Sequence, residues 1–98
     1  MADLATLTMR EARDAIAAKE LSASELTELT FKRIEETEPT LHAYVRLDQE
    51  RAMARAAEID EGGEEGPLLG VPFAVKDILD TADLATEAGS KLLAGNVP

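Results

Sequence analysis

Residues 71–76 form the only strongly strand-like run in the sequence. Large apolar side chains recur at every second position, at Val71, Phe73 and Val75, which places them on one face of an extended chain. Lys76 then lies on the opposite face. Because desolvation disfavours the charged form of a lysine, a lysine held in such a run is a candidate for proton transfer. The alternative is an ordinary lysine at the end of an edge strand, whose long side chain carries its amine to water.

Two capping patterns predict that the chain begins with helices. Thr8 and Glu11 have the Ser/Thr-x-x-Glu spacing of a capping box, in which the two residues cap the start of a helix reciprocally. This pattern predicts a helix that runs to about Glu20. Ser22 and Glu25 repeat the spacing and predict a second, amphipathic helix.

The second helix is expected to stop at Pro39, because proline interrupts helical hydrogen bonding and disfavours helical geometry in the residue before it. Residues 41–47 are mostly apolar but are interrupted by a histidine and an arginine, and we expect a short extended segment there. Asp48 suits the N-cap of a third helix, which is expected over residues 49–60.

Residues 60–67 combine glycines with four carboxylates in eight residues, a composition typical of an exposed loop. Carboxylates can bind a hard cation, but this loop has no ligand framework, and we expect no metal site. His42 is the only histidine and is expected to be an ordinary, partly exposed residue rather than a base or a ligand. Ser22 and Ser24 are better explained by capping than by nucleophilic catalysis.

Composition and charge exclude several classes of function. At 98 residues the chain is one domain at most, and its hydrophobic content of 45% is that of a soluble globular protein. A formal charge of -10 would repel phosphate backbones and acidic membrane surfaces, so we expect neither direct nucleic-acid binding nor membrane binding. The absence of cysteine excludes disulfides, and no apolar run is long enough to span a membrane, so a cytoplasmic location is expected.

The segment Gly70–Asp77, with the sequence GVPFAVKD, is followed by Thr86 and then by Ala-Gly-Ser at residues 88–90. It resembles the part of the amidase signature family that carries the catalytic lysine. The resemblance extends back over the helical part to Leu7 and so covers essentially the whole chain. It implies that Lys76 is the lysine of a Ser-cisSer-Lys triad that hydrolyses or transfers carboxamides. In that scheme the neutral lysine accepts a proton, through the cis-serine, from the serine that attacks the amide.

The sequence departs from the family pattern in the turn that follows the lysine. Asp83 and Ala85 stand where the family usually has glycine and proline, and Glu87 stands where a small polar residue is common. Ser90 resembles the serine of the Ala-Gly-Ser turn and not the nucleophile. The Gly/Ser-rich segment that supplies both triad serines does not occur in these 98 residues.

The resemblance implies an α/β fold in which amino-terminal helices lead into the first strands of a mixed sheet. We expect residues 1–98 to be a single incomplete domain with a helical front at 1–60, an acidic Gly-rich loop at 61–67 and the start of the sheet core at 68–98. The chain would supply Lys76 to an amidase without being active alone. It would act on a small-molecule amide without a cofactor, and it would form a homo-oligomer or a complex with the rest of the enzyme.

Three alternatives remain open from the sequence. Within the amidase class, the chain could belong to the amidase subunit of a tRNA-dependent amidotransferase. It could instead be a non-catalytic binding or assembly module. The third alternative is a small helical interaction protein whose likeness to the family is incidental.

Overall fold

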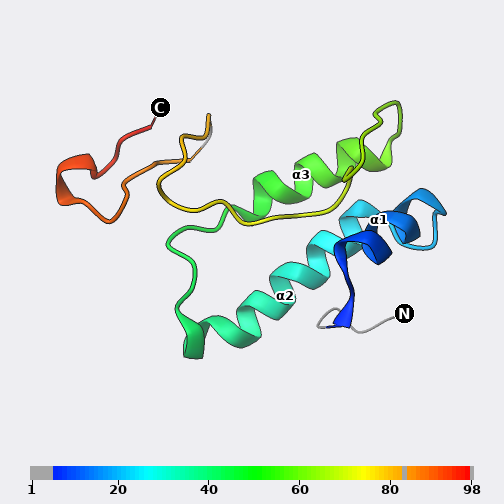
Figure 1. Ribbon diagram of the computed structural model, residues 1–98, viewed down its shortest axis with the longest axis horizontal. Helices are drawn as coiled ribbons and strands as arrows, with labels where there is room; N and C mark the ends of the chain where they lie inside the picture. Colours follow the sequence, from blue (N-terminus) through cyan, green and yellow to red (C-terminus); the bar gives the residue numbers. More distant parts are fainter. Residues whose placement is uncertain (1–5, 83, 98) are drawn as a thin grey trace.

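The computed structural model describes residues 6–82 and 84–97, so Asp83 lies outside the described residues. Figure 1 shows helices in the first part of the chain and irregular coil in most of the remainder. The elements are α1 (Met9–Ala17), α2 (Ala23–Leu41), α3 (Gln49–Asp60) and a 3₁₀ turn, η2 (Lys91–Leu93).

Both capping boxes form as predicted. The backbone N–H of Glu11 donates to Thr8 Oγ1 at 3.1 Å, and the backbone N–H of Thr8 donates to Glu11 Oε1 at 3.2 Å. The backbone N–H of Glu25 donates to Ser22 Oγ at 3.0 Å, and the reciprocal bond to Glu25 Oε1 is 3.3 Å long. These local bonds satisfy donors that the first turn of a helix leaves free, which explains why α1 and α2 start where the sequence predicts.

The end of α1 is three residues earlier than predicted. Lys19 adopts a left-handed conformation, with φ of 60°, and the backbone N–H groups of Glu20 and Leu21 both donate to the carbonyl of Ala15. This is a tight helix end, because a left-handed residue reverses the chain while the last carbonyls stay bonded. The reversal brings Ser22 directly into position to cap α2.

The prediction that Pro39 stops the second helix is wrong, because α2 continues through Pro39 to Leu41. A proline so near the end removes only its own hydrogen bond, and the next turn can still close. The helix ends instead at His42, whose φ is 49° and whose N–H donates to the carbonyl of Glu38 at 2.9 Å. The Glu38 carboxylate then accepts from the N–H groups of Ala43 at 2.5 Å and Tyr44 at 3.0 Å.

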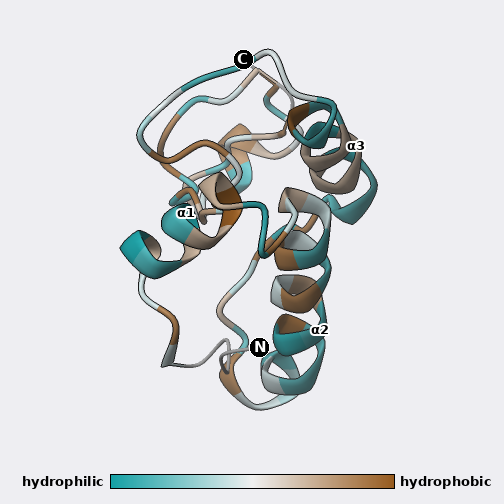
Figure 2. Cartoon of the chain, turned by 90° about the vertical axis from the view of Figure 1, so that its right-hand side faces the viewer, coloured by the Kyte–Doolittle hydropathy of each residue, from teal (hydrophilic) through white to brown (hydrophobic). Residues whose placement is uncertain are grey.

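A small apolar core lies where α1, the start of α2 and the run at Val71 meet. Its buried members are Ala12, Leu21 and Leu26, and Leu7, Ala15, Ile16 and Val71 pack against them. Figure 2 shows hydrophilic and hydrophobic positions interleaved along α2 and α3, as expected of amphipathic helices. These two helices pack against each other, and each contributes an almost fully buried alanine, Ala23 and Ala56.

Gly70 brings the run after the acidic loop onto this core. Its φ is 89°, and a Cβ at this position would lie 3.0 Å from Ile16 Cδ1 and 3.3 Å from Ala23 Cβ. Both the backbone conformation and the close approach require glycine. The next residue, Val71, is thereby placed against the core.

No strand forms within residues 6–82 and 84–97, so the strands expected at 71–76 and the extended segment at 41–47 are not observed. Leu41 instead ends α2, and the residues between α2 and α3 are irregular. A strand needs a neighbouring strand to bond its backbone, and no such neighbour lies beside residues 71–76 in the described part of the chain. Of the alternating apolar residues only Val71 packs on the core, while Phe73 is 80% exposed.

Candidate functional site

Lys76 lies where the extended run ends and the chain turns. Its carbonyl accepts hydrogen bonds from the backbone N–H groups of Ile78 at 2.7 Å and Leu79 at 3.0 Å. The lysine side chain is exposed and is one of the residues that line a cleft of about 520 Å³. The backbone at Lys76 is therefore fixed on one side by this turn, and the side chain faces an open space.

The cleft is lined by three segments that are far apart in the sequence. The first, residues 43–46, follows α2; the second, residues 74–81, contains Lys76; and the third is residues 84–86. None of these segments is helical, and backbone ladders do not join them in the described part of the chain. Side-chain interactions must therefore hold the cleft together.

Arg46, in the first segment of the cleft, bonds to Asp77 in the second segment and to Glu87, the residue that directly follows the third. Its Nη1 lies 3.3 Å from Asp77 Oδ1, and its Nη2 forms a second ion pair with Glu87 Oε1. Asp77 Oδ1 also accepts a hydrogen bond from the backbone N–H of Glu87 at 3.0 Å. The three side chains are only 26%, 22% and 27% exposed, so water screens these ion pairs less than it screens pairs on an open surface. We refer to Arg46, Asp77 and Glu87 as the Arg46 clamp.

Thr86 organises the segment that follows Lys76. Its hydroxyl donates to the carbonyl of Leu79 at 3.2 Å, and its N–H donates to the carbonyl of Asn96 at 2.8 Å. The side chain of Asn96 donates back to the carbonyl of Thr86 at 3.2 Å, and the N–H of Gly95 donates to Glu87 Oε2 at 2.5 Å. Thr86 is buried, with 6% of its surface exposed, and its hydrogen bonds join it to Leu79 before it and to Asn96 after it.

The sequence identifies Lys76 but not the groups around it. At the level of the sequence, Arg46 only interrupts an apolar segment, and Glu87 is only a departure from the family pattern. Neither residue has a local sequence pattern that indicates its partner, so no signal in the sequence identifies this ion pair. His42, in contrast, is exposed and is the C-cap residue of α2.

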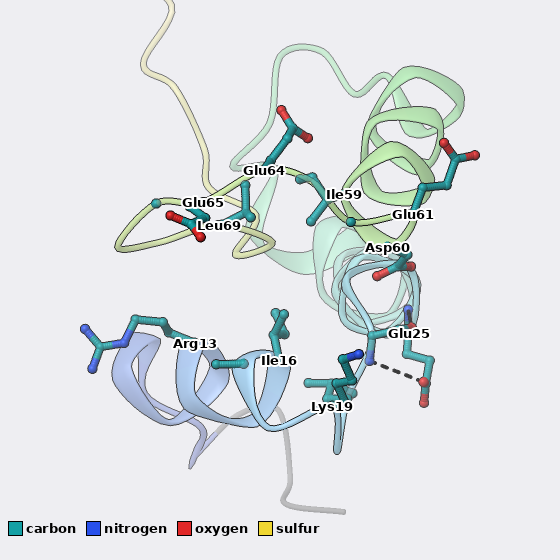
Figure 3. Close-up of a pocket in the computed structure, with 15 residues that line it drawn as sticks. Arg13, Ile16, Lys19, Glu25, Ile59, Asp60, Glu61, Glu64, Glu65 and Leu69 are labelled. Carbon is teal, nitrogen blue, oxygen red and sulfur yellow. Dashed lines mark hydrogen bonds between the residues drawn. The ribbon is translucent and has the colours of Figure 1, made fainter.

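A second hollow, of about 660 Å³, lies between α1, the start of α2 and the end of α3 (Figure 3). Its most connected polar residue is Asp60, whose carboxylate accepts from the N–H of Ala23 at 2.7 Å, the N–H of Ser24 at 3.0 Å and the Ser24 hydroxyl at 2.5 Å. The hydrogen bond from the Ser24 hydroxyl, and then those from the two backbone N–H groups, hold the pKa of Asp60 below its usual value. Asp60 thus joins the end of α3 to the start of α2, which is a structural role.

The acidic loop beside this hollow is also tied down by ion pairing. Arg55 donates to both carboxylate oxygens of Glu64, at 2.8 and 2.9 Å, and to Glu58 at 3.2 Å. These hydrogen bonds lower the pKa of Glu64 and raise the pKa of Arg55.

Within the described ranges, no group of three or more His, Asp or Glu side chains is placed to hold a metal ion. The helices described here are also too short or too polar to span a membrane.

The chain belongs to the amidase family. The family model described as Amidase matches residues 25–98, a span that contains α3, the cleft, Lys76 and nearly all of α2. No solved structure gave a significant match to the chain.

Three curated relatives share one name, which identifies each as the A subunit of glutamyl-tRNA(Gln) amidotransferase. The protein from Bartonella tribocorum is 46% identical over 101 residues, which is 100% of this chain and 20% of that protein. The protein from Carboxydothermus hydrogenoformans is 42% identical over 98% of this chain and 21% of its own length. The protein from Streptomyces coelicolor is 42% identical over 100% of this chain and 20% of its own length. The chain therefore spans about a fifth of the length of the curated relatives it matches.

Proposed function

We propose that this chain is the amino-terminal part of the amidase subunit of an amidotransferase, the alternative within the amidase class that the sequence left open. The observation that carries this proposal is identity of 42% to 46% along essentially the whole chain to proteins named as the A subunit of glutamyl-tRNA(Gln) amidotransferase. The family match over residues 25–98 supports the amidase chemistry independently of those names. We take the substrate to be a carboxamide that supplies ammonia for transfer.

Lys76 is the residue we assign to proton transfer. In the proposed reaction, a serine hydroxyl attacks the amide carbon, its proton passes through a second serine to the neutral lysine, and a tetrahedral intermediate forms, which becomes the acyl-enzyme when ammonia leaves. The carbon–nitrogen bond then breaks, and the nitrogen leaves as ammonia with the proton returned from the lysine. Water or an acceptor then cleaves the serine ester. The open cleft at Lys76 is consistent with this role, because the amine can be reached by groups from other parts of the enzyme.

The rest of the enzyme is proposed to supply both serines and to complete the fold. Several large apolar residues near Lys76 are exposed, among them Phe73 at 80%, Ile78 at 59% and Leu79 at 58%. Apolar surface of this kind is suited to burial against further protein. We propose that residues 68–98 begin a mixed sheet when the remaining strands are present, and that residues 1–60 form its helical front. The complete enzyme is proposed to be cytoplasmic and to work in a complex.

Substitution of Lys76 in the complete enzyme tests this assignment. Lys76→Ala removes the proton acceptor and should lower the rate of glutamine hydrolysis by about 10² to 10⁴, the usual contribution of general-base catalysis. Lys76→Arg should be as damaging, because arginine stays protonated and cannot accept the proton. Lys32→Ala, on the exposed surface of α2, is the matched control and should behave as the wild type. Near-normal turnover by Lys76→Arg would exclude Lys76 as the base.

A second measurement separates an amidotransferase from a general amidase. The complete enzyme, with its partner subunits, is given glutamine and glutamyl-tRNA(Gln), and the aminoacyl group is analysed. Conversion of the attached glutamate to glutamine supports the proposal. Hydrolysis of simple amides with no transfer to the aminoacyl-tRNA would instead indicate a general amidase.

A further inference from the structure

The Arg46 clamp joins Lys76 to two other segments through a single guanidinium group. Asp77 is the residue next to Lys76, and Glu87 begins the turn that leads to Ser90. Arg46 bonds a carboxylate of each and itself belongs to the loop between α2 and α3. The ion pairs therefore connect the backbone at the lysine with the first segment of the cleft and with the residue that follows the third.

The chemistry of this position favours arginine over lysine. A guanidinium carries donors on two terminal nitrogens in a rigid plane, and here each nitrogen meets a different carboxylate. Asp77 and Glu87 are close enough to share a hydrogen bond, from the Glu87 N–H to Asp77 Oδ1. Without the cation, two partly buried carboxylates would repel each other at this point.

We infer that Arg46 is a positioning residue that holds the Lys76 segment in the geometry needed for catalysis. Asp77 is fixed by both Arg46 and the Glu87 N–H, and the Lys76 carbonyl is fixed by the turn at Ile78 and Leu79. The backbone is thus restrained immediately after the lysine by both a side-chain clamp and a turn, which limits the positions that the lysine side chain can take in the cleft. This inference rests on the proposed function of Lys76 and extends it to the three residues of the clamp.

The clamp is separate from the elements that stabilise the helices. The core residues Ala12, Leu21 and Leu26 lie at α1 and the start of α2, and Asp60 joins α2 to α3. The ion pairs of Arg46 are made with residues 77 and 87 instead. Loss of the clamp should therefore disturb the cleft more than it disturbs the fold, which is the property that distinguishes positioning from simple stabilisation.

The test compares Arg46→Ala, Arg46→Lys and Glu87→Gln in the complete enzyme by steady-state glutamine hydrolysis and thermal unfolding. Displacing a reacting group by about 1 Å can cost roughly 10²-fold in rate, so Arg46→Ala should lower kcat by about tenfold to 10²-fold. KM should change much less. Arg46→Lys keeps the positive charge, but its single amine replaces the two guanidinium nitrogens that meet Asp77 and Glu87. Glu87→Gln keeps the shape of the side chain but not its charge. Both variants should therefore have kcat values between those of the wild type and Arg46→Ala. The control is Arg55→Ala, which removes a similar but more exposed pair on α3 and should leave kcat unchanged.

The outcomes separate the inference from the function on which it rests. A wild-type kcat for Arg46→Ala, together with loss of activity in Lys76→Ala, would overturn the positioning role while the proposed function stands. Activity in Lys76→Ala would overturn both. If Arg46→Ala does not fold, the kcat values of the folded variants Arg46→Lys and Glu87→Gln test the inference in its place. Equal losses of kcat in Arg55→Ala and in those two variants would show a general effect on stability and would overturn the inference.

Discussion

Gly70 is required for two separate reasons, and the two can be measured separately. Its left-handed φ of 89° disfavours any side chain, and its hypothetical Cβ meets Ile16 and Ala23 at 3.0 to 3.3 Å. Gly63 has nearly the same φ, 90°, but no atom lies within 4 Å of its hypothetical Cβ. A side chain would therefore strain the backbone at both glycines. Only at Gly70 would it also crowd neighbouring side chains.

Gly70→Ala should destabilise the protein more than Gly63→Ala. The left-handed conformation costs roughly 1–2 kcal/mol in both variants, and overpacking adds roughly 1–3 kcal/mol only at Gly70. Urea unfolding of the complete protein, monitored for both variants, gives the comparison. Equal losses of stability would show that the contacts with Ile16 and Ala23 relax at no cost.

At the scale of elements, Asp60 should make the stability of the contact between α2 and α3 depend on pH. Its carboxylate caps the first turn of α2 from another helix, and its pKa is lowered in the folded protein. A group whose pKa is lower in the folded state stabilises that state above the pKa of the unfolded chain. This stabilisation is lost as the pH falls through the folded value.

Asp60→Ala removes the acceptor and should weaken the cap by about 0.5–2 kcal/mol, the usual cost of replacing a capping residue by alanine. Hydrogen exchange of the Ala23 and Ser24 amides measures this locally, and both should exchange faster in the variant at neutral pH. The difference from the wild type should shrink in acid, once the wild-type carboxyl is protonated. Glu61→Gln, at the adjacent position, is the control. A difference that stays constant down to low pH would contradict a charged cap.

The elements that follow from local interactions can be predicted from the sequence, whereas at the candidate site the sequence identifies only Lys76 and not the groups that surround it. The starts of α1 and α2 depend on Thr8 and Ser22, each bonded to a residue three positions away, so the sequence pattern was sufficient. The prediction for the end of α2 was wrong because Pro39 acts only on its own turn. The clamp depends on Arg46 reaching residues far along the chain, and no local pattern encodes such a pair. The strand at 71–76 was predicted from its side chains alone, although strand pairing also needs a partner.

At the scale of the whole molecule, the balance of exposed apolar surface and negative charge determines how the chain behaves by itself. Phe73 and Leu92 are 80% and 96% exposed, and the buried core contains few large side chains. The formal charge of -10 favours solubility but does not cover this surface. An isolated chain should therefore associate through its apolar residues.

The isolated 98-residue chain should form oligomers at micromolar concentration and should not hydrolyse amides. Light scattering checks the first expectation, and an ammonia-release assay checks the second. Phe73→Ser removes an exposed apolar side chain and should reduce association, whereas Lys32→Ala should not. A monomer whose melting temperature does not depend on concentration would contradict the association, and turnover that Lys76→Ala abolishes would contradict the inactivity.

The bond between Asp60 and the start of α2 has a consequence for the acidic loop that follows it. This bond joins the two helices directly at the residue where α3 ends, before the chain enters the loop. A hypothetical Cβ on Gly62 or Gly63 would meet no atom within 4 Å, so added residues there have room. Exposed loops of this kind accept inserted sequence most readily. The bond between Gly62 and Gly63 is accordingly the place to insert an epitope, a fluorophore or a protease site.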